Sequence, residues 1–228
     1  KPSRYLGGEV NSIRKDIDAC PVRIALAFPD TYEVGMSHLG MQILYAILNG
    51  YPDVAAERCY APWPDMETLL RTHRLPLTTL ESRKPLSAFD LVGFSLQYEL
   101  SYTNVLNMLE LGGIPLRARD RGKEDPLVIA GGPCAFNPAP MTPFIDAFVI
   151  GEGEEVISEI AASLREAKAR GHERSRKLEQ LAAIPGIYVP ALFSGSRIRK
   201  RIVTDLDSWR VPLKPVVPLM KTIHDRIT

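Results

Sequence analysis

The side chains that could hold a ligand lie in four loops, and each loop directly follows a short apolar run. The loop at residues 29–40 reads PDTYEVGMSHLG, and residues 95–98 read SLQY. The other two loops read GGP at 131–133 and GEGE at 151–154. Glycine lets a ligand approach the backbone closely, and hydroxyl, amide and carboxylate groups can hydrogen-bond a polar ligand. The candidate binding residues are Asp30, Tyr32, Gly35, Ser37, His38, Ser95, Leu96, Gln97, Tyr98, Gly131, Gly132, Pro133, Gly151, Glu152, Gly153 and Glu154.

Most of these residues also have an ordinary structural explanation. Asp30 and Tyr32 could interact with the dipole of a following helix, and Ser95 could cap one. A single histidine near a helix start, such as His38, is more often a hydrogen-bonded loop residue than a metal ligand or an acid–base group. A tight turn explains one glycine of the GGP loop well and two less well, whereas contact with a flat ligand explains both. The acidic GEGE loop would repel phosphate, so it favours a ligand that offers amide or hydroxyl donors.

Motifs for other chemistry are absent from the sequence. It contains no GxxxxGK[ST] phosphate loop, no GxSxG nucleophile elbow and no HExxH zinc motif. Cys20, Cys59 and Cys134 lie far apart, which excludes a local iron–sulfur or zinc motif. The four histidines are scattered as well. We therefore expect binding residues in this stretch of chain, and neither catalytic residues nor protein ligands to a metal.

The composition limits the classes of partner. Lys and Arg number 28 against 27 Asp and Glu, which gives a formal net charge of +1. This balance gives no electrostatic reason to expect nucleic acid or an anionic membrane as the main partner. No apolar run approaches the roughly 18 residues of a membrane span, and no signal peptide opens the sequence. The odd number of separated cysteines favours a reducing compartment, so we expect a cytoplasmic protein.

Short apolar runs alternate with helix patterns along most of the chain. The expected strands are residues 22–28, 54–60, 91–95, 127–130 and 147–150, and the expected helices include 39–48, 64–73 and 98–111. This alternation predicts right-handed βαβ units and an α/β fold: a doubly wound, five-stranded parallel sheet of flavodoxin-like type. Ligands of such sheets bind beyond the carboxyl ends of the strands. The four loops are therefore expected at one edge of the sheet.

We divide the chain into four parts. Residues 1–21 form an arm laid over the domain, and residues 22–170 form the α/β domain itself. Residues 171–210 are expected to hold a short helix and a β-hairpin, in which 187–193 and 197–203 pair across a Ser-Gly-Ser turn. Residues 211–228 contain three prolines and no periodic pattern. We interpret them as a linker that leads into a longer protein.

Several stretches match a known family when they are taken in order. VGFSLQY, LVIAGGPCAFNP and FIDAFVIGEGEE, together with SHLGMQILYAIL, resemble the N-terminal cobalamin-binding-type domain of radical S-adenosylmethionine (radical SAM) proteins. YLGGEVNSIRK, APWPDME and LQYELSYTNVLNMLELGGIP are similar to one uncharacterised, cobalamin-binding radical SAM subgroup. The resemblance covers residues 4–193 and the exit toward HDRI.

The resemblance implies a flavodoxin-like domain with strand order 2-1-3-4-5 that receives the nucleotide tail of base-off cobalamin. The corrin would lie over the strand ends. The resemblance also implies a downstream radical SAM barrel in the same chain, which would be the partner of this domain. A 4Fe-4S cluster, bound at a CxxxCxxC motif, and S-adenosylmethionine would belong only to that missing barrel.

One position departs from the pattern of better-known cobalamin proteins. Cobalamin-dependent mutases and methionine synthases carry DxHxxG after the first strand, with the histidine as lower cobalt ligand. Residues 30–35 read DTYEVG here, so Tyr32 stands in the place of that histidine. A neutral phenol is a poor cobalt ligand, so we expect cobalamin to bind base-off without a histidine ligand.

Three functions remain open from the sequence. The leading hypothesis is a cobalamin-binding accessory domain of a radical SAM enzyme, which presents the corrin to chemistry done elsewhere. The alternative is a cofactor-free docking domain for a substrate or a partner, in which basic residues at 165–177 and 197–201 could touch RNA or protein. A stand-alone flavin or dinucleotide enzyme is the third, but it would need a phosphate-binding first loop, and PDTYEVG is acidic.

Overall fold

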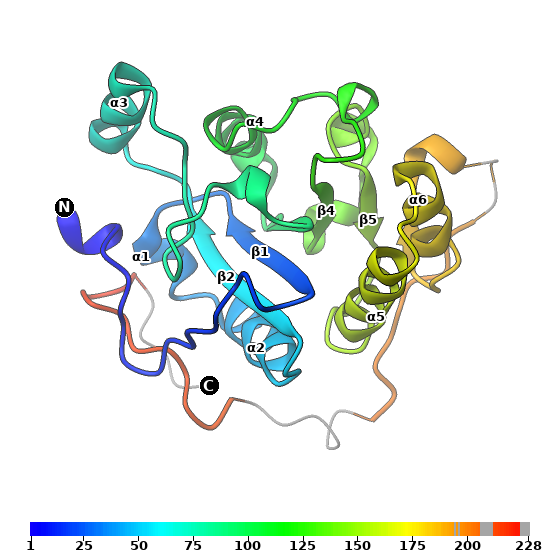
Figure 1. Ribbon diagram of the computed structural model, residues 1–228, viewed down its shortest axis with the longest axis horizontal. Coiled ribbons are helices and arrows are strands. Elements are labelled where there is room, and N and C mark those ends of the chain that lie inside the picture. The colour runs from blue at the N-terminus through cyan, green and yellow to red at the C-terminus, as the bar shows by residue number, and fades with distance from the viewer. Residues whose placement is uncertain (194, 196, 206–211, 224–228) are drawn as a thin grey trace.

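A six-stranded sheet forms the centre of the protein (Figure 1). The structure is a computed structural model that describes residues 1–193, 195, 197–205 and 212–223. The strand order is β2-β1-β3-β4-β5-β6, and all neighbours are parallel except β6, which runs antiparallel to β5. The strands are β1 (Val22–Phe28), β2 (Val54–Tyr60), β3 (Leu91–Ser95), β4 (Leu127–Gly131), β5 (Ala147–Val149) and β6 (Ile187–Tyr188). The α/β class and the mostly parallel sheet are therefore confirmed.

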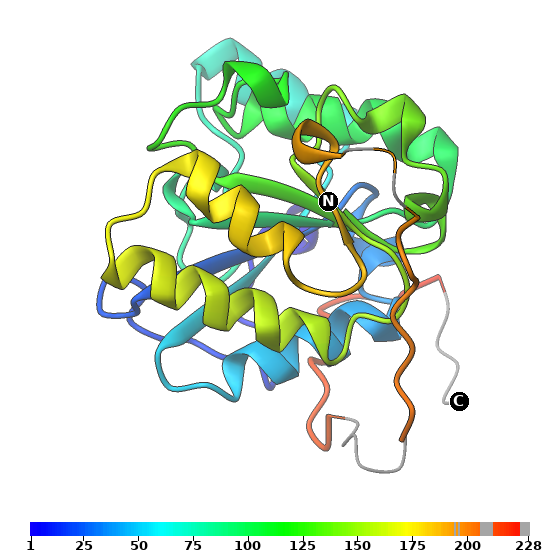
Figure 2. The same cartoon turned by 90° about the vertical axis from the view of Figure 1, so that its right-hand side faces the viewer.

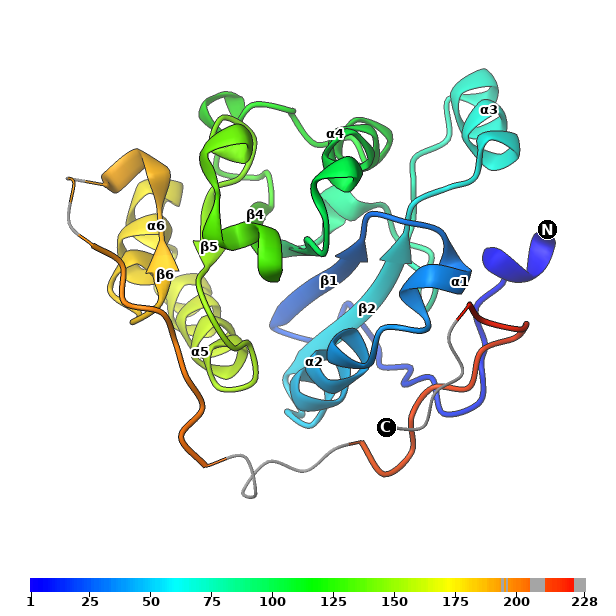
Figure 3. The ribbon, with the colours of Figure 1, turned by 180° about the vertical axis from the view of Figure 1, so that it is seen from behind.

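Helices cover both faces of this sheet, which makes three layers (Figures 1 and 3). The α-helices are α1 (Tyr32–Gly35), α2 (Leu39–Asn49), α3 (Pro64–His73), α4 (Tyr102–Leu111), α5 (Val156–Ala169) and α6 (Arg174–Ala182). The 3-10 turns are η1 (Pro2–Arg4), η2 (Leu86–Ala88), η3 (Glu99–Ser101), η4 (Ala118–Asp120), η5 (Pro133–Phe136), η6 (Ala139–Met141) and η7 (Pro190–Leu192). Helices α2 and α5 pack on one face, and α4 packs on the other.

Most strand residues are apolar because both faces are covered, as expected for a parallel sheet, and the charged exceptions are Arg23 of β1 and Glu57 and Arg58 of β2. In β1, alternate residues such as Ile24 and Leu26 join the core under α2 and α5, while Ala25 and Ala27 join the core under α4. Figure 2 shows α5 and α6 side by side over the strands, and Leu181 of α6 is buried in the first of these cores. Burial on both sides fixes the sheet and therefore fixes where its loops emerge.

Two expectations about the last part of the chain are wrong. The sheet has six strands rather than five, because the chain after α6 returns to β5 and pairs Ile187 with Val149. The predicted hairpin between 187–193 and 197–203 does not form among the described residues; Ser194 and Ser196 of its turn lie outside them. Arg201 instead forms a parallel bridge with Gly151, and its N–H donates to the carbonyl of Ile150 at 2.8 Å. Ile187 and Arg201 thus pair with the end of β5 and the residues after it rather than with each other's stretch of chain.

The N-terminal arm and residues 212–223 run side by side along the α1–α2 side of the molecule (Figures 1 and 3). Val10 bridges Val217, and Asn11 donates to the carbonyl of Pro215. The arm is anchored by a buried ion cluster, in which Nη2 of Arg58 lies 2.9 Å from Oε2 of Glu9 and Nε lies 2.7 Å from Oε1 of Glu81. The division of the chain into four parts stays a prediction. No helix in the described parts is long and apolar enough to cross a membrane.

Candidate ligand-binding site

A pocket of about 180 Å³ lies between the carboxyl half of the sheet and helices α2 and α5. Four strands contribute to its floor, β1, β3, β4 and β5, and the two helices form its walls. We call this pocket the strand-end slot. It is lined by Leu26, His38, Gly40, Leu44, Gly93, Phe94, Ser95, Gln97, Ile129, Gly131, Gly132, Val149, Gly151, Gly153, Glu154, Val156 and Ile157.

The slot exists because the sheet carries glycine on the face that α2 and α5 cover. Gly93 lies in the middle of β3, with Leu26 and Ile129 as its partners on the neighbouring strands. A Cβ atom on Gly93 would lie 3.7 Å from Ile129 and 3.9 Å from Leu26, which is ordinary van der Waals contact. At Gly131, which lies beside Ser95, a Cβ would be 3.7 Å from Val149. Packing therefore does not require glycine at these two positions, and their missing side chains leave the floor open.

Gly132 and Gly151 are glycines for a different reason. Gly132 has a φ of 100° and Gly151 a φ of 117°, a region that residues with a side chain rarely adopt. A Cβ on Gly132 would lie 2.6 Å from the carbonyl oxygen of Leu96, and one on Gly151 would overlap the backbone of Arg201. Turn geometry and close backbone packing thus account for Gly132 and Gly151. Of the GGP pair they explain Gly132 but not Gly131, in line with our interpretation that a turn explains one glycine of the pair better than two.

Glu154 brings an unsatisfied acceptor to the slot. Its Oε2 atom is buried and accepts no hydrogen bond from the described residues. A buried carboxylate oxygen without a donor is costly, because burial removes its water and nothing replaces the lost hydrogen bonds. Gly153, the residue before it, brings the loop close to Leu44 of α2. A ligand that donates a hydrogen bond would satisfy this oxygen, and the expectation that the loop favours donors stays a prediction.

His38 lines the slot as a neutral, structural histidine. Its Nδ1 caps α2 by accepting the N–H of Met41 at 3.1 Å. Burial lowers the pKa of His38, and a hydrogen bond to Gln97 opposes this shift only in part. Because Nδ1 acts as an acceptor, a neutral imidazole carries its proton on Nε2. His38 therefore has no free ring nitrogen for a metal.

The structure brings together about half of the residues that we expected in the site. Those that line the slot are His38, Ser95, Gln97, Gly131, Gly132, Gly151, Gly153 and Glu154. Leu96 is fully buried in the opposite core, and the Oγ of Ser37 bonds the carbonyl of Glu33. Pro133 begins η5, and Glu152 accepts the N–H of Val203. These four residues lie outside the slot.

The loop after β1 also lies outside the slot, apart from His38. The hydroxyl of Tyr32 donates to Glu9 at 3.1 Å and accepts the N–H of Leu219 at 3.0 Å, and only 1% of the residue is exposed. A Cβ on Gly35 would overlap the ring of Tyr60, so packing requires that glycine. Asp30 accepts a hydrogen bond from the Tyr98 hydroxyl at 2.6 Å, which ties the loop after β1 to the one after β3.

Our list of candidate residues missed the apolar lining and two glycines, Gly40 and Gly93. Gly93 stood in a quoted motif but was not chosen, although glycine inside a strand often marks a close approach of a ligand or of another backbone. The apolar lining residues, among them Leu44, Ile129 and Val156, carry no signal of their own because they match the helix and strand patterns. Among the described residues, no three His, Cys, Asp or Glu side chains are grouped so that they could hold a metal ion.

Comparison with known proteins gives the family. The family model described as "Radical SAM proteins, N-terminal" matches residues 40–190, which include α2 and all six strands except β1. An uncharacterized protein of Methanocaldococcus jannaschii is 26% identical over 134 residues, which cover 58% of this chain and 24% of that protein. The matched stretch thus spans about a quarter of the length of this relative. No solved structure matches the chain. Since the family model covers well over half of the sequence, the chain belongs to the family of radical SAM protein N-terminal domains.

Proposed function

We propose that this domain is a cobalamin-binding accessory domain and that the strand-end slot receives the nucleotide tail of base-off cobalamin. The observation that carries the proposal is the glycine floor, where Gly93 and Gly131 leave space that packing does not require. Such space at the carboxyl ends of parallel strands is where ligands of α/β sheets bind.

The size of the slot favours the tail over the corrin. Its volume of about 180 Å³ is below the roughly 300–1,000 Å³ of sites that enclose a drug-sized ligand. A single flat heteroaromatic base fits such a space, whereas a corrin has to remain outside, over the strand ends. Leu26, Ile129 and Val149 of the sheet and Val156 and Ile157 of α5 supply apolar contacts for a flat ring.

The polar groups of the slot suit the sugar of the tail. Ribose hydroxyls are hydrogen-bond donors, and the buried Oε2 of Glu154 has no donor among the described residues. Ser95 and Gln97 add a hydroxyl and an amide at the end of β3. The glutamates of this loop would repel a phosphate inside the slot, so the phosphodiester of the tail would have to lie outside it, on the corrin side.

The side chains near the slot do not suit cobalt ligation. Tyr32 is buried and both of its hydroxyl interactions are internal, and His38 uses Nδ1 for the cap of α2. We therefore propose that cobalt receives no protein ligand from either residue. Bound cobalamin would supply a cobalt centre for methyl transfer or rearrangement, and this chain's residues would bind and orient its tail. The chemistry would be completed by a radical SAM barrel, with its S-adenosylmethionine and 4Fe-4S cluster, elsewhere in the full protein.

The test is the ultraviolet–visible spectrum of the chain after incubation with hydroxocobalamin and desalting. We expect retained corrin absorbance, and much weaker retention of cobinamide, which is the same corrin without the nucleotide tail. A colourless protein under saturating hydroxocobalamin, repeated with the full-length protein, would refute cobalamin binding. Equal retention of both corrinoids would show that the slot does not receive the tail.

The alternative, a docking domain for RNA or an acidic partner, finds little support in the charges. Most of the basic residues in 165–177 are paired: Arg165 with Asp53, Lys168 with Asp90, Arg170 with Glu166, Arg174 with Asp146 and Arg176 with Glu179. In 197–201, Arg201 pairs with Glu155 and Glu159, whereas Arg197, Arg199 and Lys200 are exposed and form no ion pair within the described residues. Neutralised side chains of this kind are typical of a solvated protein face.

A further inference from the structure

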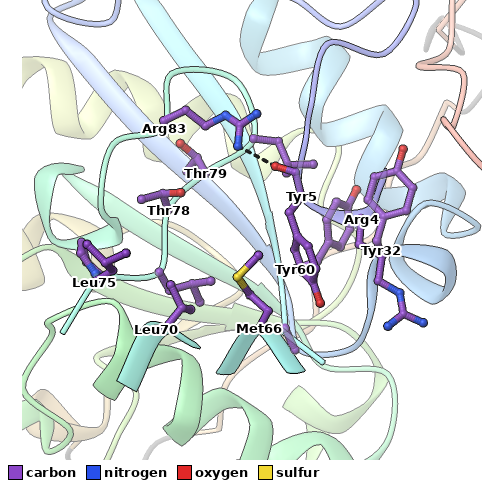
Figure 4. Close-up of a pocket in the computed structure, with 14 residues that line it drawn as sticks. Arg4, Tyr5, Tyr32, Tyr60, Met66, Leu70, Leu75, Thr78, Thr79 and Arg83 are labelled. Carbon is purple, nitrogen blue, oxygen red and sulfur yellow. Dashed lines mark hydrogen bonds between the residues drawn. The ribbon is translucent and has the colours of Figure 1, made fainter. Parts of the chain in front are cut away.

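A second pocket, of about 280 Å³, lies beyond the carboxyl end of β2 (Figure 4). Five separate stretches of chain line it: the arm at residues 4–5, Tyr32 of α1, the end of β2, helix α3 and residues 75–83. We call it the α3 pocket. It shares no lining residue with the strand-end slot.

Helix α3 packs weakly for a helix of ten residues, because Leu70 is its only buried residue. Most helical stability in proteins comes from packing of an apolar face rather than from helix propensity. The apolar residues of α3 that face inward, Met66 and Leu70, line the α3 pocket and also pack against the edge of the core under α4. The pocket therefore lies beside the few contacts that hold α3 to the domain.

The inner wall of the α3 pocket suits an aromatic group. The side chains of Met66, Leu70 and Leu75 line the pocket together with the rings of Tyr5 and Tyr60 (Figure 4). Aromatic rings favour other rings in stacked or edge-on contacts, and a methionine sulfur also contacts rings favourably. The volume is close to the lower end of small-molecule sites, roughly 300 Å³, so one or two rings would fill it.

The charge of the lining is positive. Arg4 and Arg83 line the pocket, and no Asp or Glu does. Arg4 is neutralised by Glu33, with Nη2 2.8 Å from Oε1. Arg83 donates only to backbone carbonyls, to Tyr5 at 2.6 Å and to Leu6, and it forms no ion pair within the described residues. The hydroxyl of Thr78, on the same stretch of chain, forms no hydrogen bond within them either.

We propose that the α3 pocket binds a small aromatic carboxylate, with its ring between Met66 and the tyrosines and its carboxylate near Arg83 and Thr78. A carboxylate would neutralise the one guanidinium of the lining that lacks an acid, and an apolar body would cover the inner face of α3. This site is independent of cobalamin, and its test does not depend on the strand-end slot.

The probe pair is phenylacetate and phenylacetamide, which share a ring and differ in charge. We expect saturation-transfer NMR titration of the 228-residue chain to show phenylacetate binding about tenfold tighter than the amide, as expected for a charge-assisted contact. Equal affinity of acid and amide would overturn the proposal.

Matched variants locate the binding. Met66→Trp fills the pocket, whereas Leu69→Trp adds the same ring to α3 at a residue that is 52% exposed and does not line it. Phenylacetate should no longer bind Met66→Trp and should bind Leu69→Trp as it binds the parent. Equal binding by these two variants would overturn the proposal.

The charge is tested by Arg83→Gln against Arg74→Gln. Both arginines have a positive φ, 65° and 53°, so backbone strain is matched, but only Arg83 lines the pocket. We expect about tenfold weaker phenylacetate binding in Arg83→Gln alone, and unchanged binding of phenylacetamide. Since Arg83 also holds the arm, a thermal melt accompanies each variant. If Arg83→Gln does not fold, the proposal is tested by comparing the affinities of phenylacetate and phenylacetamide for the parent and for Leu69→Trp, and equal affinities would overturn it.

Discussion

Substitution of Gly93 should make the protein more stable and its ligand binding weaker. Gly93 lies inside β3, has no positive φ, and a Cβ there would meet Leu91, Ile129 and Leu26 at 3.6, 3.7 and 3.9 Å. No neighbour has to move for a methyl group. If the glycine is present because a ligand needs the space, then a side chain at position 93 should raise the stability of the protein and weaken ligand binding.

The magnitudes follow from the geometry. Replacing glycine by alanine where the backbone is compatible stabilises a protein by about 0.4–1 kcal/mol, because the unfolded chain loses freedom. For a chain of this size, that raises the melting temperature by roughly 1–4 °C. Overfilling a packed site costs roughly 1–3 kcal/mol, so Gly93→Val should weaken cobalamin binding by about fivefold to a hundredfold. Gly93→Ala should have a smaller effect of the same sign.

The assay is a hydroxocobalamin titration and a thermal melt of each variant. Gly122→Ala is the control, because Gly122 has no positive φ, has only Asp125 within 4 Å of a Cβ and does not line the slot. Cobalamin binding by Gly122→Ala should equal that of the parent. Full-strength binding by a folded Gly93→Val protein would place the ligand outside the strand-end slot and refute the reasoning.

Three further predictions concern single side chains. Glu154→Gln should weaken cobalamin binding several-fold while leaving the melting temperature equal or higher, because it removes a buried charge whose Oε2 has no donor; a lower melting temperature would contradict this. Tyr32→Phe should lower the free energy of unfolding by about 1–3 kcal/mol in a urea titration, since Glu9 and the N–H of Leu219 lose a partner. The same substitution should leave the paramagnetic resonance spectrum of bound Co(II) cobalamin unchanged and free of nitrogen splitting. Burial alone would raise the pKa of Glu33, but the hydrogen bond from Arg4, a backbone hydrogen bond and the charges of Arg4 and Lys1 together outweigh it and lower the pKa. The Arg4–Glu33 pair therefore stabilises the fold above the unfolded pKa of about 4.3 and loses that contribution as the pH falls through the folded value. Melts of the parent and Glu33→Gln should therefore differ at pH 6 and converge toward pH 3, whereas a constant difference would contradict the assignment.

The sequence alone determined the fold class and the edge at which a site could form. The runs at 22–28, 54–60 and 91–95 became β1, β2 and β3 with the same bounds, because strands covered on both faces are mostly apolar and stand out from the stretches around them. Parallel strands all deliver their following loops to one edge, so the loops after β3, β4 and β5 could be expected to meet. Ser95, Gly131, Gly151 and Glu154 do line one slot.

Contacts between distant parts of the chain decided what sequence patterns cannot show. Tyr32 was chosen by its place in a motif, but Glu9 and Leu219, from opposite ends of the sequence, enclose its hydroxyl. Residues 187–203 have the composition of a hairpin, yet β5 competes for the same backbone groups and pairs with Ile187 and, through Gly151, with Arg201.

The glycines also show what the sequence determines and what only the tertiary structure decides. A glycine in sequence signals only that a side chain is missing. Tertiary structure shows that Gly132 lacks one because its φ and the carbonyl of Leu96 forbid it. Gly93 and Gly131 lack one where nothing forbids it, and their vacant positions form the floor of the slot. The α3 pocket also depends on the tertiary structure, since its walls come from five stretches of chain whose meeting is set by packing and not by local pattern.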